Sequence, residues 1–159
     1  MSDETDLYLQ RAENELISAQ MLFDISSNKI IQKEQFKLEK EFTFYNAVIS
    51  HSYYCIFYSA KAILIKDGIK TDAPEVHKKT LEAFEKHLVK NGKLDVDLLK
   101  IYKKMIIRAE ELLGIFSKEK SKRGTFTYQK LPQANRDPAK ESFDNASFFF
   151  KTINKIVNK

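Results

Sequence analysis

The fold is decided by one aromatic segment, Tyr45–Leu64, which reads YNAVISHSYYCIFYSAKAIL. Four aromatic side chains fall within Ser50–Ala62, with small residues between them, and neither proline nor glycine occurs before Gly68. A helix this rich in aromatic rings, with small residues between them, is stable only when other helices cover it. The segment therefore predicts a helix that is buried among other helices.

The composition agrees with a helical protein. The chain has 159 residues, of which 43% are hydrophobic, so it can build one core of ordinary size. Only 4 glycines and 3 prolines are present, too few for the many turns of an all-β fold. We expect a single all-α domain that spans residues 1–159.

Apolar residues recur at alternating steps of three and four in four segments besides the aromatic one, which is typical of amphipathic helices. The stretch Asn28–Glu41 lacks this pattern but also lacks glycine and proline, so we expect it to be ordered and partly helical. Together these segments predict an up-and-down bundle of four long helices plus one short helix. The expected helices are Thr5–Ser26, Phe42–Lys66, a short one from Thr71–Glu75 to Asn91, one from Asp95 past Gly114 to Phe116, and Asp137–Val157.

Local signals place several helix ends. Gly68 can adopt the left-handed conformation that ends a helix, and Gly92 can do the same for the short helix. Thr71 or Asp72 can cap the start of the short helix. Asp137, followed by proline, predicts the start of the last helix.

The single cysteine and the N-terminal sequence bear on where in the cell the protein is expected. Cys55 is the only cysteine, which excludes a disulfide within the chain and favours an inert core thiol in a cytoplasmic protein. The acidic start Met1–Glu4 does not resemble a signal peptide, and no apolar run reaches the ~20 residues of a membrane span. We therefore expect a cytoplasmic protein without a membrane segment.

The excess positive charge is concentrated in one segment. Ser117–Arg136 holds six basic residues and one acidic residue, which accounts for the whole net charge of +5. Such a segment is either a solvated loop or a binding site for an anionic partner such as RNA or a nucleotide. Within it, Lys122, Arg123 and Tyr128 combine cations with an aromatic face, the combination that single-stranded nucleic acid sites use.

The three histidines do not predict a metal site. His51, His77 and His87 lack the spacing of zinc or di-iron ligands, and no phosphate-binding glycine loop occurs, so no cofactor is expected. His77 is expected to pack or cap locally, and His87 to be exposed. His51 has two interpretations, a satisfied histidine at a helix interface or a contact to a ligand at a cleft.

Several of these features together resemble the HEPN domain family (higher eukaryotes and prokaryotes nucleotide-binding). The resemblance covers roughly Leu9 to Val157, and its order and spacing matter more than any single part. The parts are Arg11–Leu16 with Ala19–Leu22, Tyr45–Phe57 with its serine, tyrosine pair and phenylalanine, His77 followed by Phe84 and Val89–Gly92, and Asp137–Ala139 with Ala146.

The resemblance implies a bundle of four or five helices that is usually dimeric. Many members are toxins that cut RNA without a metal, using an arginine followed after four to six residues by a histidine. Other members pair with a small nucleotidyltransferase. Here Arg123 matches the arginine, but Tyr128 stands where the histidine is expected, and no histidine follows Arg123. A neutral tyrosine, with an unperturbed pKa near ~10, is a poor general base at neutral pH.

The sequence therefore favours a homodimeric module that binds RNA or a nucleotide, or that pairs with a small nucleotidyltransferase, without catalysis of its own. The expected cleft combines Arg123, Tyr128 and Lys122 with His51 and Tyr54. Two alternatives stay open. One is a metal-independent RNase in which His51 replaces the missing base, and the other is a purely structural interaction module.

Overall fold

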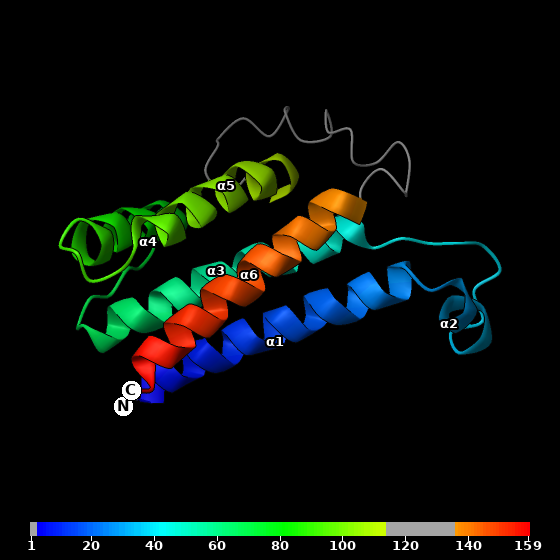
Figure 1. Cartoon of the computed structure of the whole chain (residues 1–159), viewed down its shortest axis with the longest axis horizontal. Helices are drawn as coiled ribbons and strands as arrows, with labels where there is room; N and C mark the ends of the chain where they lie inside the picture. The colour runs from blue at the N-terminus through cyan, green and yellow to red at the C-terminus, as the bar shows by residue number, and fades with distance from the viewer. Residues whose placement is uncertain (1–2, 114–135) are drawn as a thin grey trace.

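A computed structural model describes residues 3–113 and 136–159 of the chain. The described part contains six α-helices and one π-helical turn and no strand, which confirms the all-α prediction (Figure 1). Two short helices accompany the four long ones, instead of the one that was expected. The elements are α1 (Asp3–Ser26), α2 (Lys29–Glu34), α3 (Tyr45–Lys66), α4 (Val76–Phe84), the π turn η1 (Glu85–Val89), α5 (Val96–Leu113) and α6 (Arg136–Val157).

The long helices run up and down, and α3 lies at their centre (Figure 1). It packs against α1, α6, α5 and α4, and its contact with α1 is the most extensive in the molecule. Buried residues consequently occur on almost every face of α3, from Tyr45 to Leu64. The prediction that the aromatic segment is buried among other helices is confirmed.

The core is aromatic where α3, α4, α5 and α6 meet. Phe84, Tyr102 and Phe149 pack ring to ring with centroids 5.4 to 5.8 Å apart, and all three are fully buried. Cys55 lies in the same core, and burial raises the pKa of its thiol. Its predicted place in the core is confirmed.

Fully buried alanines allow the helices of the bundle to approach closely. Ala12 of α1, Ala60 of α3 and Ala146 of α6 have no exposed area. Close approach of helix backbones requires small side chains at the contact, because a larger side chain would have to displace its neighbours.

The end of α3 follows local sequence chemistry. Gly68 has a φ of +81°, and the amide of Ile69 donates to the carbonyl of Leu64 at 2.8 Å, the bond that closes a Schellman turn. A non-glycine residue would be strained at this φ. Gly92 follows η1 and also has a left-handed φ, of +82°, and its amide donates to the carbonyl of Val89 at 3.0 Å. Both predicted stops are confirmed.

The start of α3 differs from the prediction, because tertiary hydrogen bonds hold the preceding backbone. The side chain of Gln32 both donates to the carbonyl and accepts from the amide of Phe42, each at 2.9 Å. The hydroxyl of Ser26 accepts from the amide of Phe44 at 2.7 Å. Residues 42–44 are thereby fixed outside the helix, which begins at Tyr45. The expectation that Asn28–Glu41 is partly helical is confirmed, and Asn28 caps α2 with its side chain.

The predicted cap of the short helix is wrong. The helix begins at Val76, and neither Thr71 nor Asp72 caps it. The Thr71 hydroxyl is instead hydrogen-bonded to the hydroxyl of Thr80 at 2.7 Å, and the Thr71 carbonyl accepts from the ammonium of Lys61 at 2.8 Å. Thr71, which the local sequence predicted as a helix cap, thus makes tertiary hydrogen bonds instead. Among the described helices, none has the length and apolar character that crossing a membrane requires.

Candidate functional site on the seam between α1 and α3

A histidine–carboxylate pair bridges α1 and α3. Nδ1 of His51 donates to Oε2 of Glu15 at 2.5 Å. The two side chains retain 36% and 25% of their exposed area, so the pair is accessible from solvent. The hydrogen bond to Glu15 raises the pKa of His51, against the opposing effect of burial, and the charge of Glu15 adds to the increase.

The register of the two helices extends this pair into a continuous surface. Because α1 and α3 are antiparallel, Tyr8 lies opposite Tyr58 just as Glu15 lies opposite His51. The rings of Tyr8 and Tyr58 are 5.9 Å apart, and Tyr54 lies 6.1 Å from Tyr58 along α3. These rings are half-buried. We call the resulting surface the seam strip; it consists of Tyr8, Arg11 and Glu15 of α1 and His51, Tyr54 and Tyr58 of α3.

Two cations flank one ring of the seam strip. The guanidinium carbon of Arg11 lies 5.1 Å from the ring centre of Tyr8 and 5.9 Å from that of Tyr58. The ammonium of Lys61 lies 5.0 Å from the Tyr8 ring, although this lysine is only 7% exposed. All three distances are within the range of cation–π attraction.

A second histidine, His77, is half-buried close to these groups. Nδ1 of His77 is hydrogen-bonded to the hydroxyl of Tyr53 at 2.8 Å, and its ring stacks on Phe57 with centroids 4.2 Å apart. Burial, together with the charge of Lys61, lowers the pKa of His77, which favours the neutral imidazole. His77 thus attaches α4 to α3, which confirms its predicted packing role. His87 is half-buried, whereas exposure was expected.

The predicted cleft is described only in part. His51 and Tyr54 lie together on the seam strip, three residues apart on the same helix face. Lys122, Arg123 and Tyr128 lie outside the described residues, so their place beside the strip stays a prediction.

Sequence reasoning missed the contribution of the first helix. Tyr8, Arg11 and Glu15 follow each other at steps of three and four, the spacing of one helix face. The matching face of the aromatic helix is visible as His51 and Tyr58, seven residues apart. What the sequence did not supply was the register that places these two faces against each other.

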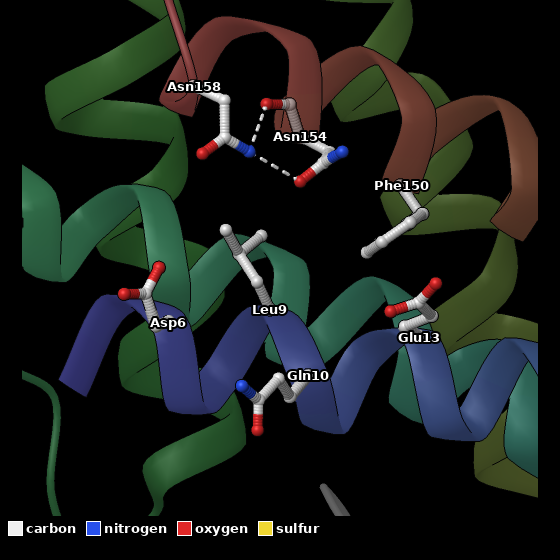
Figure 2. Close-up of a pocket in the computed structure, with 7 residues that line it drawn as sticks. All are labelled: Asp6, Leu9, Gln10, Glu13, Phe150, Asn154 and Asn158. Carbon is white, nitrogen blue, oxygen red and sulfur yellow. Dashed lines mark hydrogen bonds between the residues drawn. The ribbon is translucent and has the colours of Figure 1, made fainter. Parts of the chain in front are cut away.

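A groove elsewhere has a different character. It lies between α1 and α6, has a volume of about 210 Å³, and presents two carboxylates (Figure 2). The Asn158 amide donates to Oδ1 of Asn154 at 2.8 Å, which satisfies part of the polar lining. A negatively charged groove disfavours phosphate, so it is a weaker candidate for a nucleotide than the seam strip. Its lining residues are Asp6, Leu9, Gln10, Glu13, Phe150, Asn154 and Asn158.

Metal ligands are not gathered in the described parts of the chain. Within residues 3–113 and 136–159, no three His, Cys, Asp or Glu side chains come close enough to share an ion.

The fold and this surface define a class of protein: an antiparallel helical bundle whose central helix carries tyrosines and a histidine. The chain belongs to the HEPN domain family, since the family model matches residues 31–156. The resemblance inferred from the aromatic helix and its flanking segments is confirmed.

Two curated proteins are similar to parts of the chain. A Methanocaldococcus jannaschii protein named "Putative toxin" is 35% identical over 75 residues, which is 44% of this chain and 49% of that protein. The match thus spans about half of that relative's length. A Thermotoga maritima protein named "UPF0332 protein" is 25% identical over 112 residues, which is 70% of this chain and 72% of that protein.

Proposed function

We propose that this HEPN-type chain binds RNA or a nucleotide as a homodimer and has no catalytic activity of its own. The observation that carries the proposal is the seam strip, where solvent-accessible aromatic rings lie beside the cationic Arg11. Rings and cations side by side are the features with which proteins bind unpaired nucleotides. The basic segment Ser117–Arg136 supplies further positive charge in the sequence.

The proposed cleft combines the basic segment with the seam strip. Arg123 contributes a guanidinium for phosphate, Lys122 adds positive potential, and Tyr128 offers a stacking face. His51 and Tyr54 line the cleft from α3. A small nucleotidyltransferase is the proposed protein partner, and co-purification from the native organism tests that association.

The salt dependence of RNA binding tests the proposal. Each phosphate contact that a cation makes steepens the fall of affinity with salt, because binding releases counterions. We expect Arg123→Ala to weaken RNA binding and to reduce the slope of log affinity against log salt by about one. An unchanged slope would remove Arg123 from the site. Absence of RNA binding at low salt would contradict the proposal and would favour a purely structural interaction module.

A second candidate function is favoured by the hydrogen bond between His51 and Glu15. A carboxylate that orients a histidine and raises its pKa prepares it for proton transfer, as in many acid–base sites. The chain would then be a metal-independent RNase, a function in line with the toxin name of one relative. Arg123 would hold the phosphate while His51 replaced the absent motif histidine.

Cleavage in the presence of a chelator separates the two functions. Purified protein is incubated with total RNA and EDTA, and the RNA is resolved on a denaturing gel. Intact RNA supports the binding module. Cleavage that disappears in His51→Ala and weakens in Glu15→Gln would establish the RNase instead.

A further inference from the structure

The charges around Tyr8 are unbalanced. Among the described residues, no carboxylate oxygen lies within 4.0 Å of the cationic nitrogens of Arg11 or Lys61. Within residues 3–113 and 136–159, the partners of the Lys61 ammonium are the carbonyl of Thr71 and the rings of Tyr8 and Phe57. A buried ammonium without a counter-ion is costly, because desolvation is not offset by a paired charge. It leaves positive potential at this end of the seam strip that a bound anion can neutralise.

At the other end of the seam strip, His51 donates a hydrogen bond to Glu15, and this contact raises the pKa of the histidine against the opposing effect of burial. Tyr58 lies opposite Tyr8, and Tyr54 lies next to it towards His51; both rings are half-buried and are tilted by 31° to each other. A half-buried ring is held in place by packing while part of its surface remains open to a ligand. The strip therefore offers fixed aromatic surface next to Arg11, for which no ion pair is found among the described residues.

From this arrangement we infer that the seam strip binds unpaired nucleotides of RNA, with bases stacked on Tyr54 and Tyr58 and a phosphate beside Arg11. The inference rests on the proposed function and adds a location on described residues, together with a preference for single strands. Bases inside a duplex are stacked on each other and cannot reach the rings. An apolar protein surface would bury the charge of Arg11 without a partner, which disfavours that occupant.

The test uses equilibrium binding by the full-length protein. The probes are a fluorescein-labelled single strand of about 12 adenosines, a blunt duplex of equal length and free AMP. We expect the wild type to bind the single strand at least several-fold more tightly than the duplex. AMP should compete only at far higher concentration, because one base and one phosphate make few of the contacts.

Four variants locate the site. Tyr58→Leu keeps apolar volume but removes the stacking face, and should weaken single-strand binding about tenfold. Tyr58→Phe keeps the ring and should bind like the wild type. Arg11→Gln, at an exposed position, should weaken binding several-fold and reduce the salt slope by about one. The charge-matched control Lys100→Gln, whose side chain is 72% exposed on α5, should leave binding unchanged.

The outcomes separate this inference from the proposed function. Circular dichroism first shows that Tyr58→Leu and Arg11→Gln are folded. If both variants then bind RNA as tightly as the wild type, the RNA binds elsewhere on the protein. In that case the inference is wrong, while the proposed function stands. Equal affinity for duplex and single strand would overturn the preference for unpaired nucleotides. If the wild type binds no RNA, the inference and the proposed function fail together. Should Tyr58→Leu unfold, Arg11→Gln by itself decides the location.

Discussion

At the scale of single residues, the pair formed by His51 and Glu15 links folding to pH. Because the folded state raises the pKa of His51, it favours protonation. The resulting stabilisation is complete below the unfolded pKa near ~6.5 and is lost as the pH rises through the folded value. Both partners are partly exposed, so the effect is screened and should not exceed about 1 kcal/mol.

Glu15→Gln should therefore lower the free energy of unfolding near pH ~6 by up to about 1 kcal/mol and have little effect near pH ~9. Urea unfolding at a series of pH values measures this difference. Glu13→Gln, exposed on the same helix, is the matched control and should show no such trend. If Glu15→Gln lowers the free energy of unfolding by the same amount at every pH, the pair acts only through packing.

Two buried tyrosines allow a matched test of hydrogen bonding in the core. The Tyr53 hydroxyl is bonded to His77, whereas the hydroxyl of the equally buried Tyr102 has no hydrogen-bond partner in the described structure. Tyr53→Phe should cost about 1 to 3 kcal/mol, because it leaves an imidazole nitrogen without this partner. Tyr102→Phe should be neutral or stabilising, since it removes an unsatisfied polar atom. Equal losses in urea unfolding of the two variants would contradict the hydrogen-bond assignment.

At the scale of helices, α3 determines the architecture because neighbours cover it on nearly all sides. Ala146 of α6 faces it at close range, with its carbonyl 3.9 Å from Sγ of Cys55. Ala146→Leu should overpack this contact and lower stability by about 1 to 3 kcal/mol. Ala83→Leu, at a half-buried position on α4, should cost less. Thermal unfolding of the two variants makes the comparison, and equal effects would argue against close packing of α6 on α3.

The helices also show which features the sequence could predict. The end of α3 at Gly68 depends on one residue and its local backbone, so it was predictable. The start of α3 and the start of α4 depend on side chains distant in sequence, namely Gln32 reaching Phe42 and Lys61 reaching Thr71. A local capping rule cannot include such contacts.

The candidate site likewise has a part that the sequence could predict and a part that it could not. His51 and Tyr54 could be identified because a histidine and paired tyrosines are unusual in a plain core helix. Glu15 could not, since its role depends on the register between α1 and α3, and many registers satisfy the same apolar pattern. The part of the predicted cleft formed by Arg123 and Tyr128 lies outside the described residues.

At the scale of the whole molecule, the proposed role of this HEPN bundle is to use one helix seam as a surface for unpaired RNA. The bundle provides rigidity, because the rings of the seam strip are anchored on α1 and α3, the two helices in most extensive contact. Positive charge comes from Arg11 and Lys61 and, in the sequence, from the segment Ser117–Arg136. Whether this surface binds RNA and whether it cuts RNA are separate questions, and one assay addresses both.

The measurement that tests the central claim most directly is a salt titration of wild-type binding to labelled single-stranded RNA in EDTA, with each sample also resolved on a denaturing gel. The account predicts binding at low salt, a linear loss of log affinity with log salt, and RNA that remains intact. Absence of binding at the lowest salt, or RNA cut in a way that depends on His51, would contradict it.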